Sequence, residues 1–282
     1  MKLDDPWVRA ALDAADEAVA QGAYDRVADA LTPLPLELFV LLYFEFAAEW
    51  PHLSAWLPRL PSAADQERWT GLSGWPAMHA AAVFVGDVLA KFGRDARDAK
   101  VLDYGCGWGR MLRLLYARVR MSGIYGVDPW PPSLELVQDA PGSVAQVDYL
   151  PERLPFDEKF DLIYAFSVLT HISPNAQRAV LSAMRKHIAA DGLVALTVRP
   201  GSYWEKVDWP GPDERAALLD RHRSAGFAYI PNPPTPDGHT PDYGRASITL
   251  EHIRREWREW SVDGVQWRAA DPFQLSVYLR PA

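Results

Sequence analysis

The chain has 282 residues, 49% of them hydrophobic, which allows one large globular domain or two smaller ones. Its formal net charge of −8 argues against a nucleic-acid-binding protein, which normally carries a basic patch. The first residues lack a signal-peptide pattern, and the longest apolar run, residues 38–44, is too short to span a bilayer. We therefore expect no nucleic-acid partner, no membrane association and a cytoplasmic location. The single cysteine excludes an intrachain disulfide.

The N-terminal third of the chain is predicted to be helical. Apolar residues recur there at helical spacing, and prolines separate the stretches, at residues 7–20, 36–50 and 77–92. Pro76 is placed to open the third helix, because proline is favoured at the first helical position. We interpret residues 1–97 as a helical cap and residues 98–282 as the main domain.

From residue 98 onward, short apolar runs alternate with helical segments, which predicts a parallel sheet with helices on both faces. The expected strands lie at 100–103, 124–127, 144–147, 160–164 and 193–198. One helix is expected to begin at residue 111, and two others are expected at 133–138 and 175–189. Asp191-Gly192 should end the last of these.

Residues 199–247 interrupt this alternation. They are rich in proline and aromatic residues and contain one expected helix, at 213–224. A connection of this length inside a domain is usually functional or disordered, and its aromatic content favours an ordered lid inserted after strand five. A helix at 249–260 and two antiparallel strand-like runs, at 264–268 and 274–279, complete the chain.

A glycine-rich turn follows the first strand, where residues 101–110 read VLDYGCGWGR. A strand, a glycine turn and a helix in this order begin a dinucleotide-type binding unit. The spacing G-x-G-x-G departs from the G-x-G-x-x-G of NAD-binding proteins, and Asp103 before the turn would repel a pyrophosphate. A carboxylate here suits a cation instead, such as the α-ammonium of S-adenosylmethionine (SAM).

This run resembles the first motif of class I SAM-dependent methyltransferases. The resemblance covers about residues 98–200 and continues more loosely to the C-terminus. It implies a Rossmann-like α/β fold, with a mainly parallel sheet and an antiparallel C-terminal strand, and SAM as the cofactor. Residues 271–274 and 243–257 are also similar to a subgroup found beside sugar-modifying enzymes.

Candidate cofactor residues follow from the position of the strand ends, because ligands of open α/β sheets bind beyond the carboxyl ends of the strands. Three acids stand at such ends, Asp103, Asp128 and Asp148. Asp128 is placed to accept hydrogen bonds from ribose hydroxyls, and Asp148 from the adenine amino group. The other expected cofactor contacts are Gly105, Gly107, Pro129, Trp130, Tyr149 and, by the resemblance, Phe166. Residues 68–71 are candidates to close over the cofactor.

Two histidines are candidate general bases, His171 and His239, since imidazole titrates near neutral pH. In the family that the chain resembles, a histidine at the position of His171 is often structural. The histidines form no cluster with ligand spacing, and residues 237–242 favour a turn, so no metal site is expected. Candidate walls of an acceptor site are aromatic: Trp75, His79, Trp204, Trp209, His239 and Tyr243.

Together these features predict transfer of the SAM methyl group to a small-molecule acceptor, at a hydroxyl oxygen of a sugar or secondary metabolite. Three alternatives stay open: N-methylation of a small molecule or peptide, a SAM-binding protein without turnover, and a nicotinamide-dependent oxidoreductase. The sequence does not identify the acceptor. It leaves the oligomeric state open, with a homodimer as one expected form.

Overall fold

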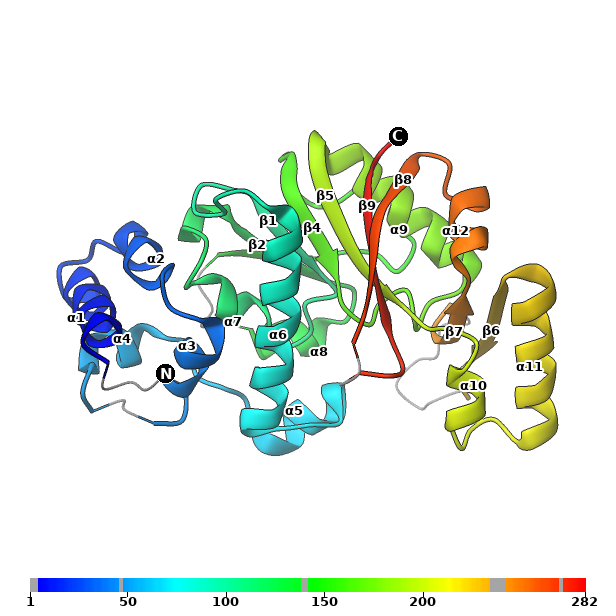
Figure 1. The fold of residues 1–282 in the computed structure, drawn as a ribbon, viewed down its shortest axis with the longest axis horizontal. Helices are drawn as coiled ribbons and strands as arrows, with labels where there is room; N and C mark the ends of the chain where they lie inside the picture. The colour runs from blue at the N-terminus through cyan, green and yellow to red at the C-terminus, as the bar shows by residue number, and fades with distance from the viewer. Residues whose placement is uncertain (1–4, 46–47, 138–141, 234–241, 269–270) are drawn as a thin grey trace. The chain divides into compact units, whose positions relative to one another are not determined.

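The computed structural model of the protein describes residues 5–45, 48–137, 142–233, 242–268 and 271–282 (Figure 1). The chain divides into two units, Met1–Gln146 and Val147–Ala282. The boundary expected near residue 97 falls inside the first unit. A separate helical cap therefore remains a prediction.

The described residues before the first strand form the helices α1 (Pro6–Ala20), α2 (Asp25–Leu31), α3 (Leu36–Leu41), α4 (Pro51–Trp56), α5 (Ala63–Thr70) and α6 (Gly74–Phe92). Helix α1 buries Val8, Leu12 and Ala15, at the three- and four-residue spacing of one helical face. Helix α6 begins at Gly74, so that Pro76 is its third residue and not its first.

The helix expected over 36–50 is wrong in length. Helix α3 ends at Leu41, and α4 begins at Pro51 after a turn. Proline disfavours the helical conformation of the residue before it, and Trp50 has a non-helical backbone at that position. The buried Trp50 instead donates its indole N–H to Asp13 of α1 at 2.8 Å, which anchors the turn to the first helix.

Parallel strands follow in the first unit. Its further described elements are β1 (Val101–Tyr104), α7 (Leu112–Leu115), the short 3-10 helix Met121–Gly123, β2 (Ile124–Asp128), α8 (Pro131–Glu135) and β3 (Ser143–Gln146). Strand β2 pairs with both β1 and β3 in parallel, with Asp103 opposite Gly126. All residues of β1 and β2 are buried, as expected for parallel strands covered on both faces.

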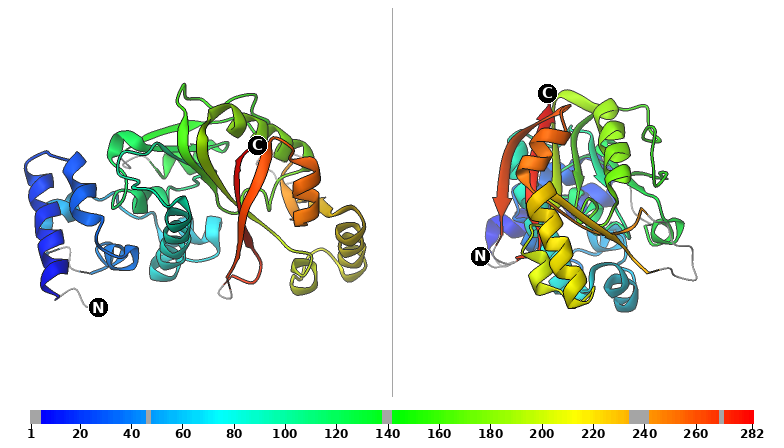
Figure 2. Two further views of the ribbon diagram at one scale, coloured as in Figure 1. Left: turned by 45° about the horizontal axis from the view of Figure 1, so that its top comes forward. Right: turned by 90° about the vertical axis from the view of Figure 1, so that its right-hand side faces the viewer.

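The second unit continues the alternation and ends in antiparallel strands. It contains β4 (Phe160–Ala165), α9 (Pro174–His187), β5 (Ile188–Val198), β8 (Trp260–Trp267) and β9 (Leu275–Pro281). Strand β5 pairs in parallel with β4. Strand β9 runs antiparallel to both β5 and β8, and β8 and β9 are orange to red in Figure 2. Strand β5 begins five residues earlier than expected, so Asp191-Gly192 lies inside this strand. The pairing of Phe160 with Ile188 accounts for the longer strand.

The segment inserted after β5 has secondary structure of its own. It comprises α10 (Tyr203–Lys206), α11 (Pro212–Ala225), β6 (Phe227–Pro231) and β7 (Gly244–Ile248), followed by α12 (Leu250–Glu256). Strands β6 and β7 form a separate antiparallel pair beside α11 (Figures 1 and 2). A small core of Tyr203, Trp204, Leu218 and Ala228 holds α10 and α11 against β6.

The strands of the first unit have the order β3-β2-β1, and the main-sheet strands of the second have the order β4-β5-β9-β8. Parallel strands, alternating helices and an antiparallel C-terminal strand confirm the expected Rossmann-like α/β fold.

Candidate functional site

The glycine turn after β1 has a left-handed backbone at each of its three glycines. Their φ angles are 75° at Gly105, 54° at Gly107 and 75° at Gly109, values that residues with a side chain rarely adopt. A Cβ at Gly109 would lie 2.9 Å from Arg113 Nη1, whereas a Cβ at Gly107 would meet nothing within 4 Å. Packing therefore explains Gly109, and Gly107 borders open space where a ligand can approach the backbone.

Asp128, at the carboxyl end of β2, is bonded directly to this turn. Its Oδ2 accepts a hydrogen bond from the Gly107 N–H at 2.9 Å, and its Oδ1 accepts one from the Trp130 N–H at 2.9 Å. The side chain is buried, and burial raises its pKa, while the two backbone hydrogen bonds lower it. Each carboxylate oxygen has two lone-pair sites, so Asp128 keeps capacity for the hydroxyl donors of a ribose.

Asp103 is also buried, and a cation lies within its electrostatic range. Burial lowers the pKa of Arg110 to about 10, and the nearby Asp103 carboxylate opposes that shift. Arg110 Nη1 also approaches the carbonyl oxygen of Ala77 on α6 at 3.5 Å. The negative charge at Asp103 is thus partly balanced within the first unit.

The loop after β2 packs on helix α5. The Trp130 ring lies 4.3 Å from the Trp69 ring, at an angle of 66°, a favourable edge-to-face arrangement. The preceding Pro129 accepts a hydrogen bond from Gln146 Nε2 at 3.3 Å through its carbonyl oxygen. From the sequence, Trp69 was expected only as part of residues 68–71, which are candidates to close over the cofactor. In the structure its ring packs on that of Trp130.

One residue that the sequence analysis did not single out, Arg113 on α7, is fully buried beside the glycine turn. Its two terminal nitrogens donate to four carbonyl oxygens, those of Trp108, Gly109 (3.1 Å), Arg59 (2.9 Å) and Leu136 (3.4 Å). A charged residue amid the apolar residues after the glycine turn was the available signal. Arg113 thus binds carbonyl oxygens of the same turn in which the Gly107 N–H donates to Asp128.

The remaining expected cofactor residues lie in the second unit. Asp148 and Tyr149 are exposed, and Phe166 is half-buried directly after β4. Their contact with a cofactor stays a prediction. The expected residues of the first unit, Asp103, Gly105, Gly107, Asp128, Pro129 and Trp130, do lie at or beside the glycine turn.

Backbone strain marks the end of β4 in the second unit. Ser167, with φ at 61°, is the one non-glycine residue with positive φ among those described. Its N–H donates to Thr197 Oγ1 at 2.6 Å, and Thr197 in turn donates to Gln274 at 2.7 Å. Residues held in such conformations cluster at ligand sites, and the carboxyl ends of parallel strands are where α/β proteins bind ligands.

His171 follows this strained residue, and both of its ring nitrogens are occupied. Nδ1 lies 3.0 Å from the Gly244 carbonyl oxygen, and Nε2 lies 2.8 Å from Arg199 Nη2. A guanidinium only donates, so Nε2 accepts and Nδ1 carries the proton. Burial, together with the charge of Arg199, lowers the pKa of His171 to about 3. A role as general base remains a prediction, and it would require release of the Arg199 bond.

The other candidates belong to several different segments of the chain. His239 lies outside the described residues. On α6, Trp75 is exposed and packs against Phe44 and His79. Trp204 is buried and donates to Ser247 at 2.7 Å, which indicates a packing role. Tyr243 is exposed and stacks on His171, with ring centres 5.6 Å apart.

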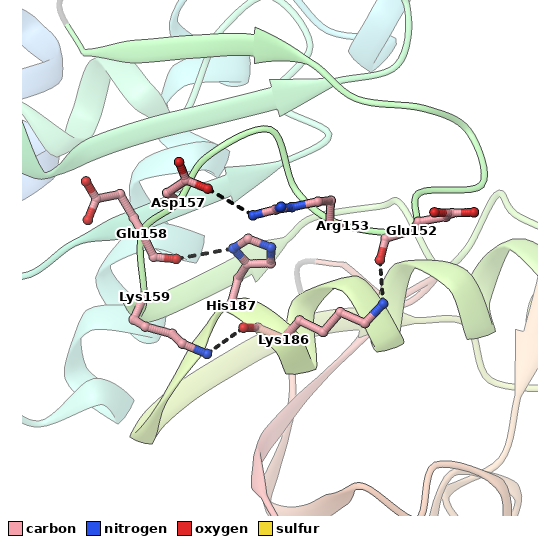
Figure 3. A pocket seen from close by; sticks show the side chains of 7 residues that line it. All are labelled: Glu152, Arg153, Asp157, Glu158, Lys159, Lys186 and His187. Atoms are coloured by element: carbon pink, nitrogen blue, oxygen red, sulfur yellow. Dashed lines mark hydrogen bonds and ion pairs between the residues drawn. The ribbon is translucent and has the colours of Figure 1, made fainter.

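A hollow of about 400 Å³ lies at the amino ends of β4 and β5 (Figure 3). Its lining is entirely charged or histidine: Glu152, Arg153, Asp157, Glu158, Lys159, Lys186 and His187. The side chains of Lys159, Lys186 and His187 are tied to backbone groups. Because ligands of this fold bind at the opposite strand ends, the hollow is not the cofactor site.

Residues 78–263 match the sequence profile of a family described as methyltransferase domain. The chain belongs to this methyltransferase family. The resemblance to class I SAM-dependent methyltransferases is confirmed, and with it the expectation of a methyltransferase that uses SAM. The subgroup linked to sugar modification stays a prediction. No curated protein matches the sequence of this methyltransferase.

Solved structures share the fold of this methyltransferase at low sequence identity. The glycopeptide N-methyltransferase MtfA complexed with SAM has a TM-score of 0.50 and 12% identity, over 73% of this chain and 94% of that one. A SAM-dependent methyltransferase from Clostridium acetobutylicum gives 0.50 and 11%, over 78% and 96%. The magnesium protoporphyrin IX methyltransferase from Synechocystis gives 0.50 and 15%, over 78% and 94%. At such identities the likeness supports the fold alone.

Among the described residues of this methyltransferase, no helix is both long and apolar enough to cross a membrane. These residues also contain no group of three or more His, Cys, Asp or Glu side chains suited to hold a metal ion.

Proposed function

We propose that the first unit binds SAM at the glycine turn and that the enzyme methylates an oxygen of a small-molecule acceptor. The observation that carries the cofactor site is the bond from Gly107 to Asp128, beside the open space at Gly107. A carboxylate held at the end of the second strand, next to a backbone without side chains, fits an adenosyl group with free ribose hydroxyls. When bound, SAM supplies an electrophilic methyl group on a sulfonium.

The residues of the chain have separate tasks in this proposal. Asp128 binds the ribose hydroxyls, and Trp130, braced by Trp69, covers one face of the adenine. Asp103 holds the ammonium of the methionine part, and Arg110 beside it meets the carboxylate of the same part. Asp148, Tyr149 and Phe166 are proposed as further cofactor contacts on the sequence prediction and the resemblance.

The enzyme's main contribution to rate in this proposal is alignment of the acceptor behind the methyl group and exclusion of water. We propose a hydroxyl of a sugar or secondary metabolite as the acceptor, supported by the weak subgroup resemblance and by the aromatic residues Trp75, Trp209 and Tyr243. Of the two predicted bases, His171 is neutral with its lone pair engaged, so the proposal relies on His239 or on alignment alone.

A calorimetric titration of the full chain with SAM, its demethylated product S-adenosylhomocysteine (SAH) and NADH tests the cofactor assignment. We expect heat from the first two and none from NADH. Binding of NADH alone would contradict the proposal. For an acceptor found by transfer of labelled methyl, the carbon chemical shift of the product methyl separates O-methylation from N-methylation, and an N-methyl product would overturn the oxygen assignment.

A further inference from the structure

Two arginines converge in the second unit near the carboxyl ends of β4 and β5. Arg199 directly follows β5 and is 8% exposed. It donates to the Thr170 carbonyl oxygen at 2.7 Å and to His171 at 2.8 Å, and its guanidinium lies 4.3 Å from the Tyr203 ring centre. Arg245, on β7, donates to the Trp209 carbonyl oxygen at 3.0 Å and lies over the Trp209 ring at 4.8 Å.

The two cations lie close enough to affect one another. The charge of Arg245 lowers the pKa of both Arg199 and His171, and burial makes the larger contribution at each. Asp271 opposes the shift at Arg199, but its two oxygens accept hydrogen bonds from the Phe273 N–H and from Gln274. Among the described ion pairs, neither Arg199 nor Arg245 has a carboxylate within 4.0 Å.

Arg199 also keeps a donor without an acceptor. Its Nε–H is buried and has no hydrogen-bond partner. Arg113 differs, because its two terminal nitrogens donate to four carbonyl oxygens. The terminal nitrogens of Arg199 instead donate to one carbonyl oxygen and one imidazole nitrogen. A buried cation without a counter-ion is costly, and an orphaned buried donor calls for an explanation.

Neighbouring features indicate a ligand site at this place. The strained Ser167 precedes Thr170 and His171 on the same loop, and its hydroxyl lies 3.2 Å from that of Thr170. The ring of Tyr243 stacks on His171, while the residue stays 44% exposed. Among the described residues, a surplus of positive charge, strain and an exposed aromatic residue thus coincide near the carboxyl ends of β4 and β5, where ligands of this fold class bind.

We infer that Arg199 and Arg245 hold an anionic group of the methyl acceptor, a carboxylate or a phosphate. This inference rests on the proposed function and narrows its substrate class to acidic small molecules. The anionic group serves recognition: it supplies the missing counter-charge and takes no part in bond formation. Tyr243 then packs against the carbon skeleton that carries the group. Arginine suits this task because its planar donors match the geometry of carboxylate and phosphate.

Acetate and inorganic phosphate are the probes, each titrated into the full chain saturated with SAH and compared with sodium chloride at equal ionic strength. We expect one of them to raise the melting temperature saturably in the wild type, and its identity distinguishes a carboxylate site from a phosphate site. Arg245→Gln should weaken the apparent affinity for that anion at least about tenfold. Arg223→Gln, which removes an exposed arginine of α11 in the same unit, should leave the affinity unchanged.

The contrary outcomes are equally specific. The anion site is overturned if neither anion raises the melting temperature more than chloride does. It is also overturned if Arg245→Gln binds the anion as tightly as Arg223→Gln and the wild type do. The milder Arg199→Lys keeps the charge but changes the donor geometry, and it should also weaken anion binding. Retained SAH binding in these experiments leaves the proposed function intact, whereas loss of SAH binding in the wild type would count against the proposed function itself.

Discussion

Gly107 donates its backbone N–H to Oδ2 of Asp128 at 2.9 Å. This hydrogen bond joins the turn after β1 directly to the acid at the end of β2. The bond fixes the carboxylate beside the open space at Gly107. It also shows that an acid distant in sequence from the glycine motif lies directly beside it.

Replacing Gly107 with alanine tests whether that open space belongs to the cofactor. At its φ of 54°, a side chain costs about 1–2 kcal/mol of stability. We also expect weaker SAH binding, because the new methyl group occupies the space that we assign to the ligand. Calorimetry and urea unfolding measure the two effects separately.

Gly86→Ala is the matched control, since Gly86 lies within α6 and a Cβ there also meets nothing within 4 Å. Alanine in a helix interior should stabilise the protein by up to about 1 kcal/mol and leave SAH affinity unchanged. If Gly107→Ala bound SAH as tightly as Gly86→Ala does, the space beside Gly107 would not be a ligand site.

Arg113→Lys should weaken cofactor binding although Arg113 need not touch the cofactor. A lysine cannot reach four carbonyl oxygens at once, so the turn from Trp108 to Gly109 loses its support. We expect a loss of about 2 kcal/mol in stability and SAH affinity lower by about tenfold.

Arg118→Lys separates this positioning role from a general loss of stability. Arg118 likewise donates to backbone carbonyls, those of Leu31, Leu34 and Ala117, none of which lies in the glycine turn. This variant should lose stability and keep its SAH affinity. Equal SAH affinities of the two variants would reduce Arg113 to a structural residue.

The pH dependence of stability should report His171. In the unfolded chain the pKa of this histidine is about 6.5, while in the folded protein its pKa is about 3. Below pH 6.5 the unfolded state therefore binds more protons, and the unfolding free energy falls as the pH falls.

The difference between the wild type and His171→Phe isolates this contribution, since other histidines are present in both proteins. From pH 7 to pH 5 the wild type should lose about 2 kcal/mol more stability than the variant. Urea unfolding at several pH values measures the difference. Equal pH slopes for the two proteins would mean that His171 is accessible to protons in the folded state, as a general base would be.

Local patterns predicted much of the fold and part of the site. Strands β1, β2 and β4 begin within one residue of their expected positions, because short apolar runs bounded by glycine or acidic residues allow few alternatives. The same regularity placed Asp128 at the end of β2, where it meets the glycine turn. The helix end was not predictable over residues 36–50, since a uniformly apolar run has no periodicity to show where a helix stops.

Contacts between residues distant in sequence were beyond prediction. The four carbonyl partners of Arg113 come from three different segments, and no spacing rule relates Arg59 to Leu136. The engagement of His171 depends on Gly244 and Arg199, which the chain brings together only through the fold of the inserted segment. Titration chemistry made His171 a plausible base, whereas its neighbours give it a low pKa.

Calorimetric titration of Asp128→Asn with SAH, beside the wild type, tests the central claim most directly. Asp98→Asn removes an exposed carboxylate of the same unit that pairs with Arg120, and it serves as the control for lost charge. If Asp128 binds the ribose, the Asp128→Asn protein should stay folded in a melting curve and bind SAH about 1.5–3 kcal/mol more weakly than the wild type, with Asp98→Asn unchanged. Wild-type affinity in a folded Asp128→Asn protein would contradict the account.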